Sequence, residues 1–222
     1  MAWYGGQDGA IRNRLRNTSG EAYSRFQNSL SSTVTMKNYT DSIEANKDTS
    51  VIGMLLHNPT SQAELIEDIN KMGEIEGDSS PVAIAVAFSW NLKNFDDISD
   101  IVCQRLSGLY LFQICQMKKP DLARFISRCP NLKSLMLTGM DDIGPDFIAQ
   151  VFSNGMLPKL EFLESEGSDD AIAAMASAPD LRKIFFRYTD LSITNDGFKR
   201  LVEAGGGKKL VEISVSKRSI MA

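Results

Sequence analysis

A repeated motif constrains the fold of this 222-residue chain more than any other feature of its sequence. Three segments carry a proline two residues before a leucine: Cys129–Leu132, Leu157–Leu160 and Ala178–Leu181. Each opens a short run in which apolar residues follow relative positions 1, 4 and 6, with one polar substitution in the second run. A repeat of this length predicts units that bury their apolar side chains against their neighbours.

The same spacing recurs on both sides of these segments. The copies are Leu132-Leu135-Leu137, Leu160-Leu163 with Ser165 in third place, Leu181-Ile184-Phe186, Leu210-Ile213-Val215 and, upstream, Leu109-Phe112-Ile114 and Val82-Ala85-Ala87. From residue 109 onward, the leading residues are separated by 23, 28, 21 and 29 residues. These intervals fit one strand plus one returning helix, because successive parallel strands need a crossover of about a dozen residues or more.

The connecting segments have the apolar period of helices. Their apolar faces are Phe95, Ile98, Ile101, Val102 and Leu106; Leu122, Phe125 and Ile126; Phe147, Ile148, Val151 and Phe152; Ile172, Met175 and Ala176; and Phe198, Leu201 and Val202. One strand–helix unit cannot enclose its own apolar side chains, but stacked units share a core. The sequence therefore predicts an α/β fold with about six parallel strands in residues 81–222.

Two segments resemble a known repeat family. Residues 129–137 (CPNLKSLML) and 191–201 (LSITNDGFKRL) are similar to the strand and to the helix start of leucine-rich repeats of the cysteine-containing, ribonuclease-inhibitor-like type, as in F-box proteins. The resemblance covers residues 81–217; it departs from the family pattern at Ser165, in the irregular repeat lengths and in the missing Asn or Cys after most strands. It implies a right-handed β/α solenoid that binds other proteins.

The chain before the repeats has a different amino-acid composition. Residues 1–60 are polar and form a predicted arm that is partly ordered, and residues 61–80 form a capping helix, expected at 61–72, and a linker. The arm contains scattered apolar residues, among them Trp3, Tyr4 and Phe26, which are too few for a core of their own. Its arginines at 12, 14, 16 and 25 fit either a solvated basic arm or a mitochondrial transit peptide.

Residues that usually carry chemistry are sparse. His57 is the single histidine, and the three cysteines, Cys103, Cys115 and Cys129, lack the spacing of a zinc site. The glycines at 205–207 follow a predicted helix, so they fit helix termination better than phosphate binding. We therefore expect no catalytic residues, no metal and no cofactor, and we expect the protein not to be an enzyme.

Net charge, apolar runs and cysteine count limit the partners and the cellular location that we expect. The net charge of −4 offers no overall basic field for nucleic acid, and the sequence has no apolar run long enough for a membrane span. An odd number of widely spaced cysteines and the lack of a secretory signal predict an intracellular protein, cytoplasmic or nuclear, with mitochondrial location as an alternative.

Strand alternation predicts which side chains leave the core. If positions 1, 4 and 6 face inward, positions 3 and 5 face outward. These are Leu111 and Gln113, Ser134 and Met136, Phe162 and Glu164, Lys183 and Phe185, and Glu212 and Ser214; position 7 adds Glu166 and Arg187. Apolar side chains with a charged rim are typical of protein-binding patches. The predicted contact residues are Met136, Phe162, Glu164, Glu166, Lys183, Phe185 and Arg187.

The sequence thus predicts a non-catalytic protein-binding module, an adaptor or a subunit of a larger complex, that uses the open face of the sheet. Two alternatives are a substrate-receptor subunit of a ubiquitin ligase and a mitochondrial assembly factor or subunit. A different interpretation of the patch is that the arm of residues 1–60 folds back over it. We also expect the edge of the last strand, about 210–217, to be blunted by Lys217 and Arg218 or to need a cover that a partner subunit would supply, and we favour the second.

Overall fold

Seven parallel strands form a single open sheet in the computed structural model. The model describes residues 52–57, 61–73, 81–87, 92–140, 142–189 and 193–217. The strands lie side by side in chain order, and every neighbouring pair is parallel. They are β1 (Ile52–His57), β2 (Val82–Ala87), β3 (Leu106–Phe112), β4 (Ser134–Thr138), β5 (Phe162–Ser165), β6 (Lys183–Thr189) and β7 (Glu212–Lys217).

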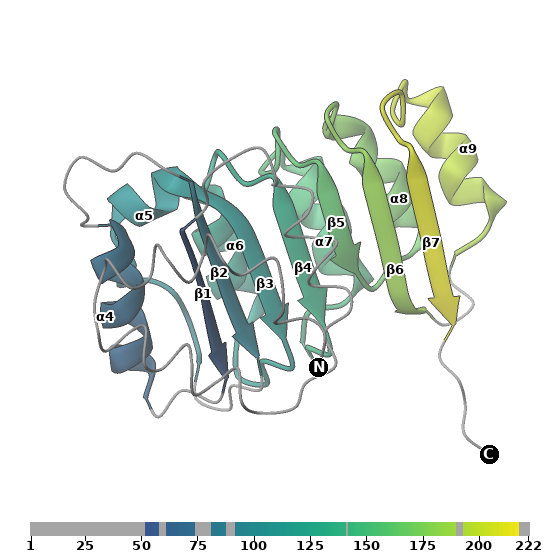
Figure 1. Ribbon diagram of the computed structural model, residues 1–222. Coiled ribbons are helices and arrows are strands. Elements are labelled where there is room, and N and C mark those ends of the chain that lie inside the picture. The colour runs from purple at the N-terminus through teal and green to yellow at the C-terminus, as the bar shows by residue number, and fades with distance from the viewer. Residues whose placement is uncertain are drawn as a thin grey trace, which may run out of the picture.

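A helix precedes or follows almost every strand, as the helical periods predicted. The helices are α4 (Gln62–Gly73), α5 (Asp100–Arg105), α6 (Lys119–Ser127), α7 (Pro145–Ser153), α8 (Asp169–Ala174), continued by a 3₁₀ turn at Met175–Ser177, and α9 (Asn195–Glu203). Figure 1 shows α6, α7 and α8 behind the sheet, so that one face of the sheet is covered by helices. The predicted α/β class with parallel strands is confirmed.

The three proline–leucine motifs form the same turn, and the segment before Leu210 forms it without a proline. The backbone N–H of each leading leucine donates to the carbonyl three residues back, at 3.2 Å for Leu132, 3.3 Å for Leu160, 3.2 Å for Leu181 and 3.1 Å for Leu210. The next residue then donates across to the previous unit, from Lys133 to Ser107 and from Arg182 to Glu161, for example. The sequence repeat is therefore also a repeat of backbone geometry.

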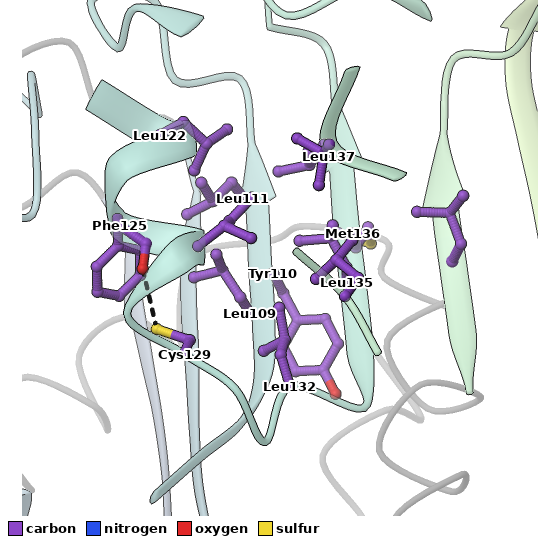
Figure 2. Close-up of a cluster of buried hydrophobic side chains, with 14 of the residues drawn as sticks. Leu109, Tyr110, Leu111, Leu122, Phe125, Cys129, Leu132, Leu135, Met136 and Leu137 are labelled. Atoms are coloured by element: carbon purple, nitrogen blue, oxygen red, sulfur yellow. Dashed lines mark hydrogen bonds between the residues drawn. The ribbon is translucent and has the colours of Figure 1, made fainter. Parts of the chain in front are cut away.

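The core lies between the sheet and its helices. Leu109 and Leu111 of β3 point toward Leu122 and Phe125 of α6, and all four side chains are at most 1% exposed (Figure 2). Leu135 on β4 aligns with Leu109 in the next copy and is equally buried. Apolar side chains from successive units thus form one continuous cluster.

The predicted register of the first two repeats is wrong. Leu109 aligns with Leu135, so it holds position 4 of its repeat, and Leu106 holds position 1. Ile84 and Val86, rather than Ala85 and Ala87, align with the inward leucines of β3. The error arises because residues 109–112 read Leu-Tyr-Leu-Phe, which is apolar on both faces and shows no alternation.

The structure also differs from the sequence prediction at one segment boundary and at two side chains. β1 lies inside the predicted polar arm, and its last residue is His57, whereas α4 agrees with the predicted helix. Ile101 and Val202, predicted to face the core, are 58% and 69% exposed. The predicted arm otherwise falls on residues 1–51, which lie outside the described residues.

Candidate protein-binding surface

The face of the sheet opposite the helices, here called the open face, is defined by alternate residues of each strand. Side chains of Leu109 and Leu111 point to the helices, so those of Tyr110 and Phe112 point to the open face. Register carries this assignment across the sheet. The central open-face residues are Ala83 and Ala85 on β2, Tyr110, Ser134 and Met136, Phe162 and Glu164, Lys183 and Phe185, and Glu212 and Ser214.

Burial divides this face into two parts. Tyr110, Met136, Phe162 and Glu164 are 1%, 3%, 1% and 2% exposed. The prediction that Met136, Phe162 and Glu164 are exposed is therefore wrong. Strand alternation predicts the face of the sheet on which a side chain lies, but it does not predict whether another segment covers that face. Their part in protein binding stays a prediction.

The remaining predicted contacts lie toward the C-terminal end of the sheet. Lys183 and Phe185 on β6 and Glu166 after β5 are half-buried. The ring of Phe185 stands 5.5 Å from that of Phe162, at an angle of 32°. Lys183 pairs with Glu212 of β7 at 3.2 Å, and both side chains are accessible to solvent. The side chain of Arg187 lies outside the described residues.

An exposed apolar group, which we call the terminal surface, lies at the last unit. It consists of Val202 on α9 and of Val211, Ile213 and Val215 at β7. Ile213 and Val215 are each 43% exposed, although they align with the fully buried Ile184 and Phe186 of β6. The sequence predicted that the last strand lacks a cover, but not that the helix would share the exposure. The repeat pattern carried a signal for this, since a side chain that packs on a neighbouring unit is exposed where the described residues include no such neighbour.

Two buried cysteines lie close together on the helix side of the sheet. The Cys129 thiol donates to the carbonyl of Phe125 at 3.2 Å. A hydrogen bond with Cys103, together with burial, raises the pKa of Cys129, so this thiol stays protonated at neutral pH. The third cysteine, Cys115, is half-buried.

Charged residues line a hollow of about 460 Å³ between the starts of α6 and α7. Lys118 forms an ion pair with Asp142, and Lys119 bonds Asp146 at 2.5 Å. The hydrogen bond from Lys119 lowers the pKa of Asp146. Both lysines are thus already neutralised by carboxylates, and the hollow does not present free positive charge.

The described part of the chain offers no cluster of three His, Cys, Asp or Glu side chains suited to a metal ion. None of the helices described here combines the length and hydrophobicity that a membrane span requires. Both alternatives, the ubiquitin-ligase receptor and the mitochondrial factor, depend on residues 1–60, most of which lie outside the described residues.

Comparisons with known proteins leave the family open. No family model matches the chain, and no curated protein matches its sequence significantly.

Proposed function

We propose that the protein is a non-catalytic protein-binding module, an adaptor or a subunit of a larger complex, built as a right-handed solenoid of the leucine-rich-repeat type. The turn shared by Leu132, Leu160, Leu181 and Leu210 supports the repeat architecture. The in-order parallel sheet with helices on one face supports it further. Both features are what stacked strand–helix units produce.

The terminal surface carries the proposal of protein binding. At β6, which pairs with β7, Ile184 and Phe186 are 0% and 1% exposed. At β7 the equivalent Ile213 and Val215 are 43% exposed. Exposed apolar groups that adjoin one another mark interaction sites in soluble proteins. A partner that packs here would bury the same atoms that each inner unit buries against its successor.

The open face next to β7 supplies a rim for this contact. Lys183 and Glu212 are charged and solvent-accessible, and Phe185 beside them is half-buried. An apolar centre with a charged rim is the usual arrangement of a protein interface. Of the contacts expected from the sequence, Lys183 and Phe185 belong to this rim, whereas Met136, Phe162 and Glu164 do not because they are buried.

Aspartates in the terminal surface test the proposal. We expect the double variant Ile213→Asp, Val215→Asp to weaken partner binding at least about 30-fold, because interface anchors contribute about 2 kcal/mol or more. The matched control is Ile101→Asp, which places a carboxylate on an apolar side chain that is 58% exposed at the other end of the molecule.

The measurement is quantitative mass spectrometry of proteins that co-purify with the tagged full chain. Proteins retained by the wild type and by Ile101→Asp but lost by the double variant are partners of the terminal surface. If the three chains retain the same proteins in the same amounts, the terminal surface is not the binding site. Circular dichroism of each variant checks that the fold is kept.

A further inference from the structure

The open face of the sheet is buried over β2 to β5, although the helices lie on the other side. Tyr110, Met136 and Phe162 are at most 3% exposed, and Ser134 and Thr138 beside them are 1% and 2% exposed. Figure 2 shows the Tyr110 ring on β3 away from the side on which Leu109 and Leu111 meet α6. None of the described helices packs on this face (Figure 1). Something other than these helices must therefore exclude solvent from it.

Burial fades along the sheet toward its C-terminal end. On β2, Ala83 and Ala85 are 8% and 6% exposed. On β6, Lys183 and Phe185 are half-buried, and on β7 the open-face residues are exposed. The cover is thus most complete over β3, β4 and β5, and it ends before β7. A segment that enters the sheet at β1 reaches these strands before it reaches β7.

Chain length favours one undescribed segment as the cover of the open face. The undescribed stretches between elements are short, the longest being residues 74–80, and each is held at both ends by a strand or a helix. Residues 218–222 follow β7, where the open face is exposed. Residues 1–51 lead directly into β1, next to β2, and are long enough to span the whole sheet, since an extended chain covers about 3.3 Å per residue and strands lie about 4.8 Å apart.

The distribution of charge also favours residues 1–51 as the segment that covers the open face. The Glu164 carboxylate is 2% exposed and points to the open face, with Glu166 close behind it in the chain. A carboxylate this deeply buried is stable only with a cation or several donors, and guanidinium groups are well suited to that role. Residues 10–30 contain four arginines and one acidic residue, together with apolar residues such as Leu15, Tyr23 and Phe26.

We propose that the N-terminal segment, residues 1–51, packs over the open face of β2 to β5 of its own chain. Its apolar residues cover Tyr110, Met136 and Phe162, and an arginine from the group at 12, 14, 16 and 25 pairs with Glu164. This inference goes beyond the proposed function, because it assigns the central part of the open face to an internal segment. External partners are then left with the terminal surface and its rim.

A photo-crosslink in the full chain tests the contact. Phe112 lies half-buried on the open face of β3, and p-benzoylphenylalanine at this position keeps an aromatic side chain there. We expect irradiation to join residue 112 to peptides from residues 1–51 within the same chain, as seen by mass spectrometry of the monomeric band. The control places the same probe at Val211, which is 67% exposed, and should give no such product. Crosslinks from 112 only to another copy, or none to residues 1–51, would overturn the proposal.

A second measurement tests the arginines. The variant Met136→Cys places a thiol where the side chain is 3% exposed, and maleimide labelling at this residue is followed by peptide mapping. We expect labelling to become at least about tenfold faster when the arginines at 12, 14, 16 and 25 are changed to Gln, because breaking a buried ion pair is strongly destabilising. The charge control is Lys37→Gln with Lys47→Gln, which should leave the rate unchanged. An equal rate in all three backgrounds would overturn the arginine pairing. Partner loss on aspartate substitution at Ile213 and Val215 is a separate outcome, so the two proposals can fail independently.

Discussion

At the residue scale, two small residues, Ser165 and Gly167, lie where one repeat lacks its third apolar residue. Ser165 holds that position and aligns with Phe186 on the neighbouring strand. The Phe186 ring lies over Gly167, where a Cβ atom would come within 2.3 Å of the ring atom Cδ1. The ring thus occupies the space that a side chain at residue 167 would need. Ser165 itself is 1% exposed, and its hydroxyl donates to the carbonyl of Glu166 at 2.9 Å.

We expect Gly167→Ala to lower the free energy of unfolding by about 1–3 kcal/mol, the usual cost of overpacking a buried site. Phe186→Leu in the same chain should recover part of this loss, because the smaller side chain frees space for the methyl group. The control is Gly144→Ala, whose Cβ would meet its nearest neighbour at 3.4 Å. Urea unfolding of the wild type, the two single variants, the double variant and the control gives the comparison, and additive costs for the Gly167 and Phe186 changes would contradict the packing argument.

At the element scale, the starts of α8 and α9 are fastened to each other. The Asp169 carboxylate accepts from the backbone N–H of Thr194 at 2.8 Å and from its hydroxyl at 2.6 Å. The same hydroxyl caps α9 by accepting from the N–H of Asp196 at 3.1 Å. Gly197 is required beside this contact, because a Cβ there would lie 2.8 Å from the Asp169 Cα. The Thr-Asn-Asp-Gly run of the repeat motif therefore serves contact between units as well as helix initiation.

This contact predicts an acid-sensitive part of the stability. The hydrogen bonds from Thr194, the side chain first and then the backbone, lower the pKa of Asp169. A carboxyl group with a lower pKa in the folded state stabilises the fold above its unfolded pKa of about 4, and this contribution is lost as the pH falls through the folded value. We expect Thr194→Ala to cost about 1 kcal/mol at neutral pH. The difference from the wild type should shrink under acid conditions.

The matched control for Thr194→Ala is Ser168→Ala. Ser168 caps α8 by accepting from the N–H of Ala171 at 3.2 Å. Its removal should therefore lower stability by a similar amount at all pH values. Urea titrations at neutral and acid pH measure both differences. A Thr194→Ala difference that is as constant as that of Ser168→Ala would show that Asp169 contributes nothing acid-sensitive.

Elements with strong turn signals were predictable from the sequence, and elements without them were not. The proline–leucine motifs located the repeats led by Leu132, Leu160 and Leu181, because the motif forms a fixed turn before each strand. β1 was not predicted because it lies in a polar region with no such motif. The same limit applies to the candidate site. Sequence alternation placed Met136 on the correct face, but its burial depends on contacts far away in the sequence.

At the scale of the whole molecule, the sheet has two unlike ends. Strands contact only their immediate neighbours, because the order in the sheet is the order in the chain. Polar contacts between units follow the same rule: Lys159 bonds Asn131 at 2.6 Å, and Lys209 bonds Asp180 at 2.5 Å. The inner units are held from both sides, whereas β7 and α9 are held from one. Local opening should therefore be easiest at the end that carries the terminal surface.

Two core substitutions of equal chemistry test this asymmetry. Leu201 on α9 and Leu135 on β4 are 2% and 0% exposed, and replacing either by alanine should cost about 2–5 kcal/mol. We expect Leu201→Ala to speed amide hydrogen exchange in α9 and β7 by about 30-fold or more while β3 and β4 keep most of their protection. Leu135→Ala should speed exchange in β3, β4 and β5, because those strands share its contacts. Hydrogen exchange with mass spectrometry on the full chain separates these patterns. If Leu201→Ala speeds exchange in β3 as much as in β7, the sheet opens as one unit, and the terminal surface is no more mobile than the core.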